Sequence, residues 1–178
     1  IKAAEYDECN NLIRYTAPGH TQSTTFSYGD GDGAREAHLL RESHTPLGTD
    51  SHYGYDGYGN CLRSDISGIV GSQASIIRTT AEYENLRNYV YKETNARGKS
   101  TTFDVDEYKG TTTRITDPKN NSVDYEYDTL RRIVKVKAMD GTEEYRNEYA
   151  YDPTRGYLIG IKHNVDATSS NDVSYTFE

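Results

Sequence analysis

The chain has 178 residues, a net charge of -8 and a sequence pI near 5.1. This balance excludes a general nucleic-acid binder, because phosphate contacts need clustered Lys and Arg. A hydrophobic fraction of 34% and a mean hydropathy of -0.90 argue against one large central core. Tyr supplies 17 residues, and disordered chains are poor in aromatic residues, so we expect a folded chain built in thin layers.

A tyrosine–aspartate pattern recurs along the whole chain. The clear copies are Tyr6-Asp7, Tyr53-Gly54-Tyr55-Asp56, Tyr125-Glu126-Tyr127-Asp128 and Tyr149-Ala150-Tyr151-Asp152. The weaker copies contain Tyr28, Tyr83, Phe103 with Asp106, and Tyr175. Successive copies lie roughly 22 to 28 residues apart, a spacing typical of stacked repeats. The sequence therefore predicts a repeat scaffold.

The residues around each copy predict two strands joined by turns. In the clearest copy, Val123, Tyr125 and Tyr127 share one face, and acidic residues occupy the other, as a strand requires. The second strands are expected at 12–15, 133–136 and 158–161. Turn residues occupy 56–60 and 152–156 at one junction, and 95–98, 117–121 and 139–142 at the other. The Asp of each copy is expected to accept backbone N–H bonds in the turn that it opens.

These hairpins predict an all-β fold. One isolated hairpin is marginal in water, so tandem hairpins should pair into one continuous, curved antiparallel sheet with two exposed edges. We expect a single array of about seven to eight hairpin repeats over residues 1–178, with no membrane span. Ile1 begins directly in repeat sequence and the last copy stops near Glu178, so we expect a piece of a longer protein, without a signal peptide.

Two stretches are less regular. Residues 34–41 fit a short helix and a long second strand equally well, and residues 68–75 are expected to form a loop. Cys9 and Cys61 sit at different offsets from the repeat, which favours two thiols over a disulfide. Residues 131–137 alternate basic and apolar side chains and predict a strand with a solvated basic face.

The repeats resemble the YD-repeat, or rearrangement-hotspot (Rhs), family. Its consensus is Tyr-x-Tyr-Asp-x-x-Gly-Arg-Leu, often followed by an Asp-Pro-x-Gly-Asn-like turn. Tyr125, Tyr127, Asp128 and Arg132 match it, while Arg131 replaces the glycine and Ile133 the leucine. The copies that begin at Tyr53 and Tyr149 match with an inserted residue, and residues 117–121 fit the intervening turn.

This resemblance implies a sheet that spirals into a hollow shell. In bacteria such shells typically enclose a toxic C-terminal domain, and a more distant, related barrel belongs to animal teneurins. It implies that this chain is a non-catalytic shell segment that encloses or presents a C-terminal toxin or effector domain. The implied parent is a secreted or cell-surface protein, bacterial in origin, and the implied partner is the rest of that polypeptide. The motif that precedes the toxin in the family is absent, so no autoproteolytic residue is carried over.

No pattern in the sequence assembles a catalytic or metal site. His38, His44 and His52 are read as scattered surface residues, and Asp30-Gly31-Asp32-Gly33 lacks the later ligands of a calcium loop. Paired acids on the strands fit a solvated face. Asn120-Asn121-Ser122 is a glycosylation sequon that matters in a eukaryotic secretory pathway. We therefore expect no enzyme, metal or cofactor.

The alternative function is a surface adhesin or glycan-binding array, in which rows of Tyr rings stack on sugars. The two hypotheses differ in whether the rings pack against neighbours or face solvent. Under both, the expected site residues are those of the structural repeat: Tyr6, Asp7, Tyr28, Tyr53, Tyr55, Asp56, Tyr83, Phe103, Asp106, Tyr125, Tyr127, Asp128, Tyr149, Tyr151, Asp152 and Tyr175.

Overall fold

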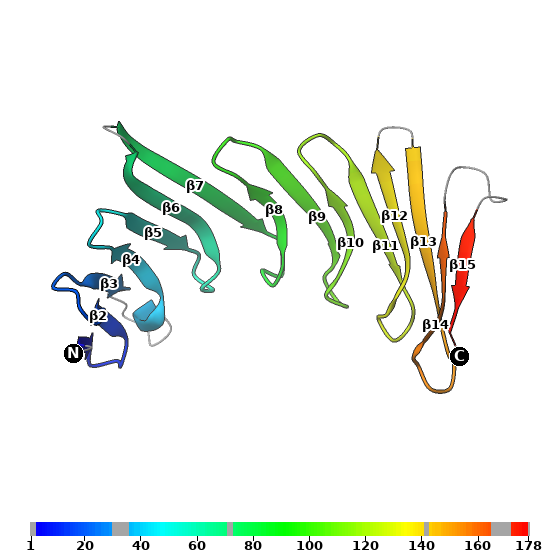
Figure 1. The fold of residues 1–178 in the computed structure, drawn as a ribbon, viewed down its shortest axis with the longest axis horizontal. Coiled ribbons are helices and arrows are strands. Elements are labelled where there is room, and N and C mark those ends of the chain that lie inside the picture. Colours follow the sequence, from blue (N-terminus) through cyan, green and yellow to red (C-terminus); the bar gives the residue numbers. More distant parts are fainter. Residues whose placement is uncertain (1–2, 30–35, 71–72, 141–142, 165–171, 178) are drawn as a thin grey trace. The chain divides into compact units, whose positions relative to one another are not determined.

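The computed structural model describes residues 3–29, 36–70, 73–140, 143–164 and 172–177. Within these ranges the fold is all-β, with 15 antiparallel strands and one short 3-10 helix, η1 (Glu36–His38). Sheet order follows chain order from β1 to β15, so every strand pairs with its neighbours in sequence (Figure 1). The prediction of tandem hairpins in one open antiparallel sheet is confirmed.

The strands fall into two compact units. The first unit comprises Ile1–Glu82 with Thr94–Gly98, and the second comprises Tyr83–Glu93 with Lys99–Glu178. The strands of the first are β1 (Ala3–Tyr6), β2 (Leu12–Thr16), β3 (Thr24–Tyr28), β4 (Leu40–His44), β5 (Asp50–Tyr55), β6 (Cys61–Val70) and β7 (Gln73–Tyr83). Those of the second are β8 (Val90–Thr94), β9 (Ser100–Asp106), β10 (Thr111–Thr116), β11 (Ser122–Tyr127), β12 (Ile133–Asp140), β13 (Glu143–Tyr151), β14 (Leu158–His163) and β15 (Val173–Thr176).

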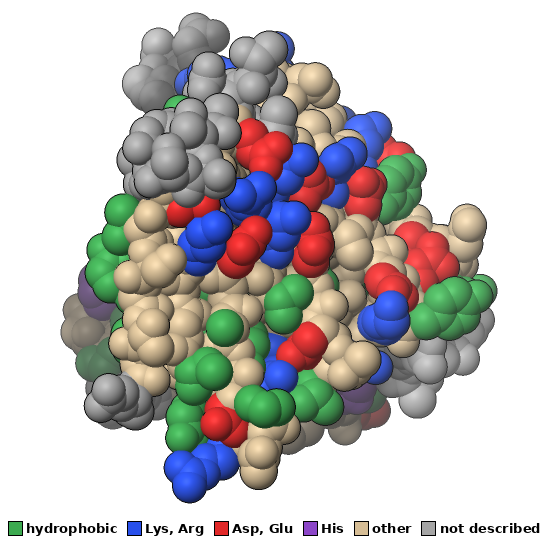
Figure 2. Space-filling model, turned by 90° about the vertical axis from the view of Figure 1, so that its right-hand side faces the viewer, with side chains coloured by type: hydrophobic (Ala, Val, Ile, Leu, Met, Phe, Trp, Pro, Cys, Tyr) green, Lys and Arg blue, Asp and Glu red, His purple; other side chains and the backbone are tan. Residues whose placement is uncertain are grey.

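Strand alternation gives the second unit two unlike faces. Register places Tyr125 opposite Val136, and Tyr149 opposite Ile161, on what we call the aromatic face. Acidic and basic residues form rows across the strands on the charged face: Asp104, Arg114, Asp124, Lys137 and Arg146 in one row, and Glu126, Lys135, Glu148 and Lys162 in the next. Figure 2 shows basic and acidic side chains interleaved in this way. Opposite charges across strands stabilise the pairing and leave the face close to neutral.

Ion pairs connect the charged face. Arg114 donates from Nε and Nη2 to both carboxylate oxygens of Asp124, at 2.5 and 3.2 Å. Lys135 lies 3.1 Å from Glu126. The same arrangement occurs in the first unit, where Arg78 on β7 donates to Asp65 on β6 at 2.7 and 2.8 Å. The predicted solvated face of acidic residues is therefore a face of cross-strand ion pairs.

No described hydrophobic side chain is fully buried. Asn11 and Asp65, both polar, are the buried residues of the described chain, each 8% exposed. Most residues of the aromatic face are half-buried, because the described strands form a single layer. The low hydropathy of the chain thus corresponds to a sheet held by backbone ladders, half-covered rings and polar bonds.

The expected loop at 68–75 is wrong. β6 continues to Val70 and β7 resumes at Gln73, with Gly68 paired to Ser75 and Ser67 to Ile76. The extra residues of this repeat extend both strands. Their backbone N–H and C=O groups are hydrogen-bonded in the antiparallel ladder, so a loop is not needed to accommodate them.

The other local predictions meet different outcomes. Of residues 34–41, the described part is η1 followed by the start of β4 at Leu40. Cys9 and Cys61 are not joined by a disulfide, as expected. The basic stretch divides, because residues 131–132 belong to a turn and β12 begins at Ile133. The Asp30–Gly33 motif lies outside the described residues.

Among the described residues, no helix has the length and apolar character that crossing a membrane requires.

Candidate functional site

The feature that recurs with chemical regularity is a turn opened by aspartate. In the turn at 56–60, Asp56 Oδ1 accepts the backbone N–H of Tyr58 at 2.9 Å and that of Asn60 at 3.0 Å. The side-chain amide of Asn60 donates to the other carboxylate oxygen at 3.2 Å. One carboxylate therefore holds the whole five-residue turn, using the bonding that short acidic side chains favour.

Three further turns repeat this arrangement. Asp7 bonds to the backbone and side chain of Asn11, Asp117 to those of Asn121, and Asp128 to those of Arg132. The fourth residue of each of the four turns has a positive φ: Asn10 at 64°, Gly59 at 92°, Asn120 at 70° and Arg131 at 62°. A left-handed residue at this position follows a tight turn and returns the chain to the second strand.

Two turns carry one more residue. Asp106 accepts the N–H groups of Tyr108 and Lys109 before Gly110, and Asp152 accepts those of Thr154 and Arg155 before Gly156. Gly110 has a φ of 67° and Gly156 one of 81°. In these two turns the residue with a positive φ is the fifth, one later than in the other four turns. It is a glycine, which adopts a positive φ without steric cost.

Hydrogen bonds within the turns lower the pKa of several of these carboxyls. The side-chain amide of Asn11 lowers the pKa of Asp7, and the side chain of Lys109 lowers that of Asp106. Backbone N–H bonds from Asn121 and Arg132 lower the pKa of Asp117 and of Asp128. Each carboxylate is therefore ionised in its turn, where it acts as an acceptor.

The second tyrosine of the repeat joins one hairpin to the preceding one. Tyr55 donates its hydroxyl to the carbonyl of Leu40 at 2.9 Å, and Tyr151 donates to that of Ile133 at 2.8 Å. Tyr28 and Tyr127 make the same kind of bond, to Leu12 at 3.2 Å and to Thr112 at 2.8 Å. Each ring lies over the neighbouring hairpin, and burial raises the pKa of Tyr55 and of Tyr127.

A change of register accompanies these tyrosines. The pairing shifts between Gly54 and Tyr55, between Glu126 and Tyr127, and between Ala150 and Tyr151. A bulge gives one strand an extra residue and redirects the side chain that follows. The extra residues are Leu62, Val134 and Ile159, all on the strand that follows the tyrosine. The recurring bulge therefore lies opposite the second tyrosine, and a sequence period of 2 gives no sign of it.

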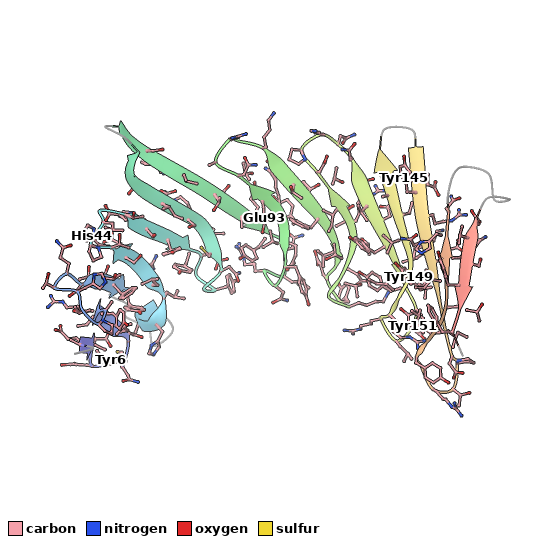
Figure 3. All side chains as sticks on the ribbon, viewed as in Figure 1. Tyr6, His44, Glu93, Tyr145, Tyr149 and Tyr151 are labelled. Carbon is pink, nitrogen blue, oxygen red and sulfur yellow. The ribbon has the colours of Figure 1, made fainter. Side chains whose placement is uncertain are left out.

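The residue four positions after the aspartate reaches the next repeat. Arg132 donates from Nε to Asp128 at 2.7 Å and from Nη1 to the carbonyl of Gly156 at 2.8 Å. Its guanidinium carbon lies 4.3 Å from the ring centroid of Tyr151, a cation–π contact (Figure 3 labels Tyr151 on β13). Arg132 thus binds its own turn, the next turn and the tyrosine between them.

Asn11 makes the equivalent contact in the first unit. Its amide donates to Asp7 at 2.8 Å and to the carbonyl of Ala37 at 2.8 Å, and its Oδ1 lies 2.6 Å from His38 Nδ1. Sequence reasoning selected the tyrosines and aspartates and missed this position. The available signal was the recurrence of Asn11, Asn60, Asn121 and Arg132 four residues after an aspartate.

The remaining repeat residues have less uniform surroundings. Tyr53, Tyr83, Phe103, Tyr125 and Tyr149 are half-buried on their strands. Tyr6 and Tyr175 are 58% and 53% exposed, on the first and last described strands. The ring of Tyr175 contacts His163 edge to face, with centroids 5.7 Å apart.

The histidines are divided among separate polar contacts. His38 bonds to Asn11, His44 to Asp50, and His52 Nε2 lies 3.7 Å from Glu42. His44, His52 and both acids line a hollow of about 440 Å³ on β4 and β5. The described residues contain no group of three or more donors placed to hold a metal ion. The contacts of His44 and His52 are cross-strand pairs on a sheet surface.

Comparison with known proteins identifies the fold. No family model and no curated protein matches the sequence. The Photorhabdus luminescens Tc holotoxin pore with a mutation in TccC3 matches in structure with a TM-score of 0.51 and 13% identity, over 94% of this chain and 10% of that one. The TcdB2–TccC3 complex and its complex with Cdc42 match with the same TM-score and identity. The chain spans about a tenth of the length of the chains that it matches.

Proposed function

We propose that this chain is a non-catalytic segment of a YD-repeat shell that encloses or presents a C-terminal toxin or effector domain. The parent is a secreted or cell-surface bacterial protein, and residues 1–178 are one array of its repeats. The observation that carries the proposal is the bond between repeats, in which Tyr55 and Tyr151 donate to carbonyls of the preceding hairpin. These bonds join successive repeats of the sheet, which is a structural role.

The fold similarity supports this function. The matched structures are parts of toxin complexes, and 94% of this chain matches a tenth of a much longer chain. A sheet in which each hairpin bonds to the previous one extends by addition of further hairpins, as repeat proteins do. The YD-repeat pattern, and a sheet that can be lengthened by further hairpins, both support the proposal that this chain is a segment of a larger structure.

The arrangement of polar groups supports a structural role over catalysis. The aspartates of the repeat accept hydrogen bonds from backbone N–H groups of their turns. On the charged face, Arg114 pairs with Asp124 and Lys135 with Glu126 across neighbouring strands. An active site needs acids, bases or nucleophiles that converge on a hollow and are free to contact a substrate. We therefore assign no enzymatic activity to this segment.

The alternative is an adhesin or glycan-binding array, and one observation favours it. Tyr145 on β13 and Tyr175 on β15 are 52% and 53% exposed, so their rings are accessible for stacking on sugars. The second tyrosines of the repeat instead lie against neighbouring hairpins, as a shell requires. For this reason the shell segment is the better assignment.

Electron microscopy of the native full-length polypeptide, combined with limited proteolysis, tests the proposal. A closed hollow particle that protects a C-terminal fragment from protease is the expected result. An extended rod or solid particle, with a C-terminal part that is digested as fast as that of the denatured protein, would contradict it. Binding of the isolated chain to a glycan array, lost on substitution of Tyr145 and Tyr175 by Ala, would favour the adhesin.

A further inference from the structure

Exposed apolar side chains recur at the turns of one edge of the second unit. Three of them lie two residues after the acid that opens their turn, and are 51%, 90% and 70% exposed: Leu86, Tyr108 and Leu130. In the fourth turn, opened by Asp152, Thr154 holds this position, and Tyr157, 47% exposed, lies three residues further on. Antiparallel strands reverse at every turn, so alternate turns share an edge (the lower edge of this unit in Figure 1), and consecutive turns on it are about 10 Å apart.

A basic residue occupies the next position of all four turns. These residues, each exposed, are Arg87, Lys109, Arg131 and Arg155. In the turns opened by Asp7 and Asp56 in the first unit, the same position holds Asn10 or Gly59. The basic row is therefore a property of the second unit and not a requirement of the repeat. We call the turns at 84–89, 106–110, 128–132 and 152–157 the basic edge.

Two members of the row keep a basic side chain where the backbone opposes it. Arg87 has a φ of 59° and Arg131 one of 62°, at the position that Asn10 and Gly59 occupy in the first unit. Glycine and asparagine adopt this left-handed conformation readily, whereas a long side chain there is strained. Backbone strain of this kind is concentrated at functional sites, where a particular side chain is needed. The two arginines therefore point to a role in binding.

The acids of the basic edge bond into their turns, while its bases extend into solvent. The carboxylates that accept backbone N–H groups of their own turns are those of Glu84, Asp106, Asp128 and Asp152. Lys109 lies 3.0 Å from Asp106, yet its side chain is 65% exposed and that of Asp106 is 26% exposed. Glu107 is half-buried. A surface that approaches this edge therefore meets positive groups first. The net charge of -8 opposes this little, because charges more than about 10 Å away are largely screened by salt.

We propose that the basic edge docks on an anionic lipid surface. The basic side chains contact the headgroups, and the apolar side chains beside them enter the interfacial layer. Lys and Arg are attracted to anionic lipid, while Tyr and Leu gain by leaving water at a membrane interface. Leu86 and Leu130 favour lipid over an anionic polymer, because leucine has no ring to stack on a sugar or a base. Since the four turns share one edge, they can meet one surface together. This inference goes beyond the proposed shell segment and does not depend on it.

Co-sedimentation of the 178-residue chain with lipid vesicles tests the docking. Vesicles of phosphatidylcholine with about 30% phosphatidylserine are compared with vesicles of phosphatidylcholine alone, at about 0.1 M salt. We expect binding to the anionic vesicles that is at least about tenfold tighter than to the neutral ones. Arg131→Gln should weaken it about fivefold, and Arg131→Gln with Arg155→Gln about 25-fold, because each basic residue at an anionic surface contributes a factor of about five. Leu130→Ser should weaken it about tenfold through lost apolar burial.

Two variants control for charge and for folding. Lys119→Gln removes the same charge from an exposed position in the turn after β10, on the opposite edge of the unit, and should leave vesicle binding unchanged. Arg131→Lys keeps the charge at the same left-handed position and should bind like the unaltered chain. Far-UV circular dichroism of each variant verifies that the sheet is retained.

Three results would overturn the docking. One is equal binding to the two kinds of vesicle, or binding to neither. Another is a loss with Lys119→Gln as large as that with Arg131→Gln, which would remove the assignment to this edge. The third is binding to heparin, weakened by Arg131→Gln, without binding to vesicles, which would assign the basic edge to an anionic polymer. Electron microscopy of the full-length polypeptide tests the shell separately, so each proposal can fail without the other.

Discussion

The hydroxyl of Tyr151 lies 2.8 Å from the carbonyl oxygen of Ile133, to which it donates a hydrogen bond. Ile133 is the cross-strand partner of Tyr127, the tyrosine of the preceding repeat. Tyr55 has the same relationship to Leu40, the partner of Tyr28. In these two repeats the second tyrosine therefore bonds to the residue that faces the second tyrosine of the repeat before it. This relationship explains why the position carries a hydroxyl, which Phe lacks.

Tyr151→Phe should weaken the link between two repeats. The substitution keeps the ring and removes the donor, so the free energy of unfolding is expected to fall by about 0.5–1.5 kcal/mol. Urea unfolding followed by circular dichroism measures the change. Tyr145→Phe, on the same strand and half exposed, is the matched control and should change stability little. Equal losses in the two variants would show that the bond to Ile133 contributes nothing specific.

Arg132→Lys should also be destabilising, although it preserves charge. Lysine has no planar fork to bind Asp128 and the Gly156 carbonyl together while stacking on Tyr151. The expected loss is about 1–3 kcal/mol, the range for a charged hydrogen bond with a cation–π contact. Arg131→Lys, at the exposed neighbouring position, is expected to be neutral. A neutral Arg132→Lys variant would mean that charge alone is required.

Two glycines of one turn should respond differently to alanine. Gly59 has a φ of 92°, whereas Gly57 is not among the positive-φ residues, and neither site has an atom within 4 Å of an added Cβ. Gly59→Ala is expected to cost about 1–2 kcal/mol of stability, because the left-handed backbone opposes a side chain. Gly57→Ala should be neutral or slightly stabilising. Thermal unfolding of both variants measures the contrast, and similar melting temperatures would refute the conformational argument.

Arg131→Gly should stabilise the chain. Arg131 has a φ of 62°, a left-handed conformation in which a residue with a Cβ is strained. Relief of a left-handed non-glycine residue is expected to contribute up to about 1 kcal/mol, less the entropy of a more flexible unfolded chain. Denaturant unfolding at pH 7 measures the gain. A destabilised variant would indicate that the exposed Arg131 side chain makes a favourable contact that outweighs the strain.

Acid should destabilise the fold through its turn carboxylates. Hydrogen bonds lower the pKa of Asp7, Asp106, Asp117 and Asp128 in the folded chain. A lowered folded-state pKa gives stability that is present above the unfolded value, near 4, and is lost as pH falls through the folded value. The free energy of unfolding should therefore be nearly constant from pH 7 to 5 and decline below about pH 4. An Asp128→Asn variant should show a shallower decline, and an unchanged stability from pH 5 to pH 3 would contradict the assignment.

The sequence by itself determined the repeat, its strands and its turns. Alternation around Tyr125 and Tyr127 predicts a strand, because the side chains of a strand alternate between its faces. A run that contains Pro or Gly predicts a reversal, because Pro presets a φ that suits turns and Gly adopts a positive φ without steric cost. These signals are local. They failed at residues 68–75, where Gly and Ser occupy strands whose backbone groups are satisfied by the ladder and not by side chains.

Only the tertiary structure showed which residues form the hydrogen bonds between successive repeats. The bond of Tyr151 to Ile133 and the contact of Arg132 with Gly156 join residues that lie 18 to 24 positions apart in the chain. No local pattern encodes those distances, because they depend on the register of two hairpins at once. The shared edge of three exposed turn residues was hidden for the same reason. Leu86, Tyr108 and Leu130 look like unrelated turn residues until the pairing of the strands places their turns on one edge.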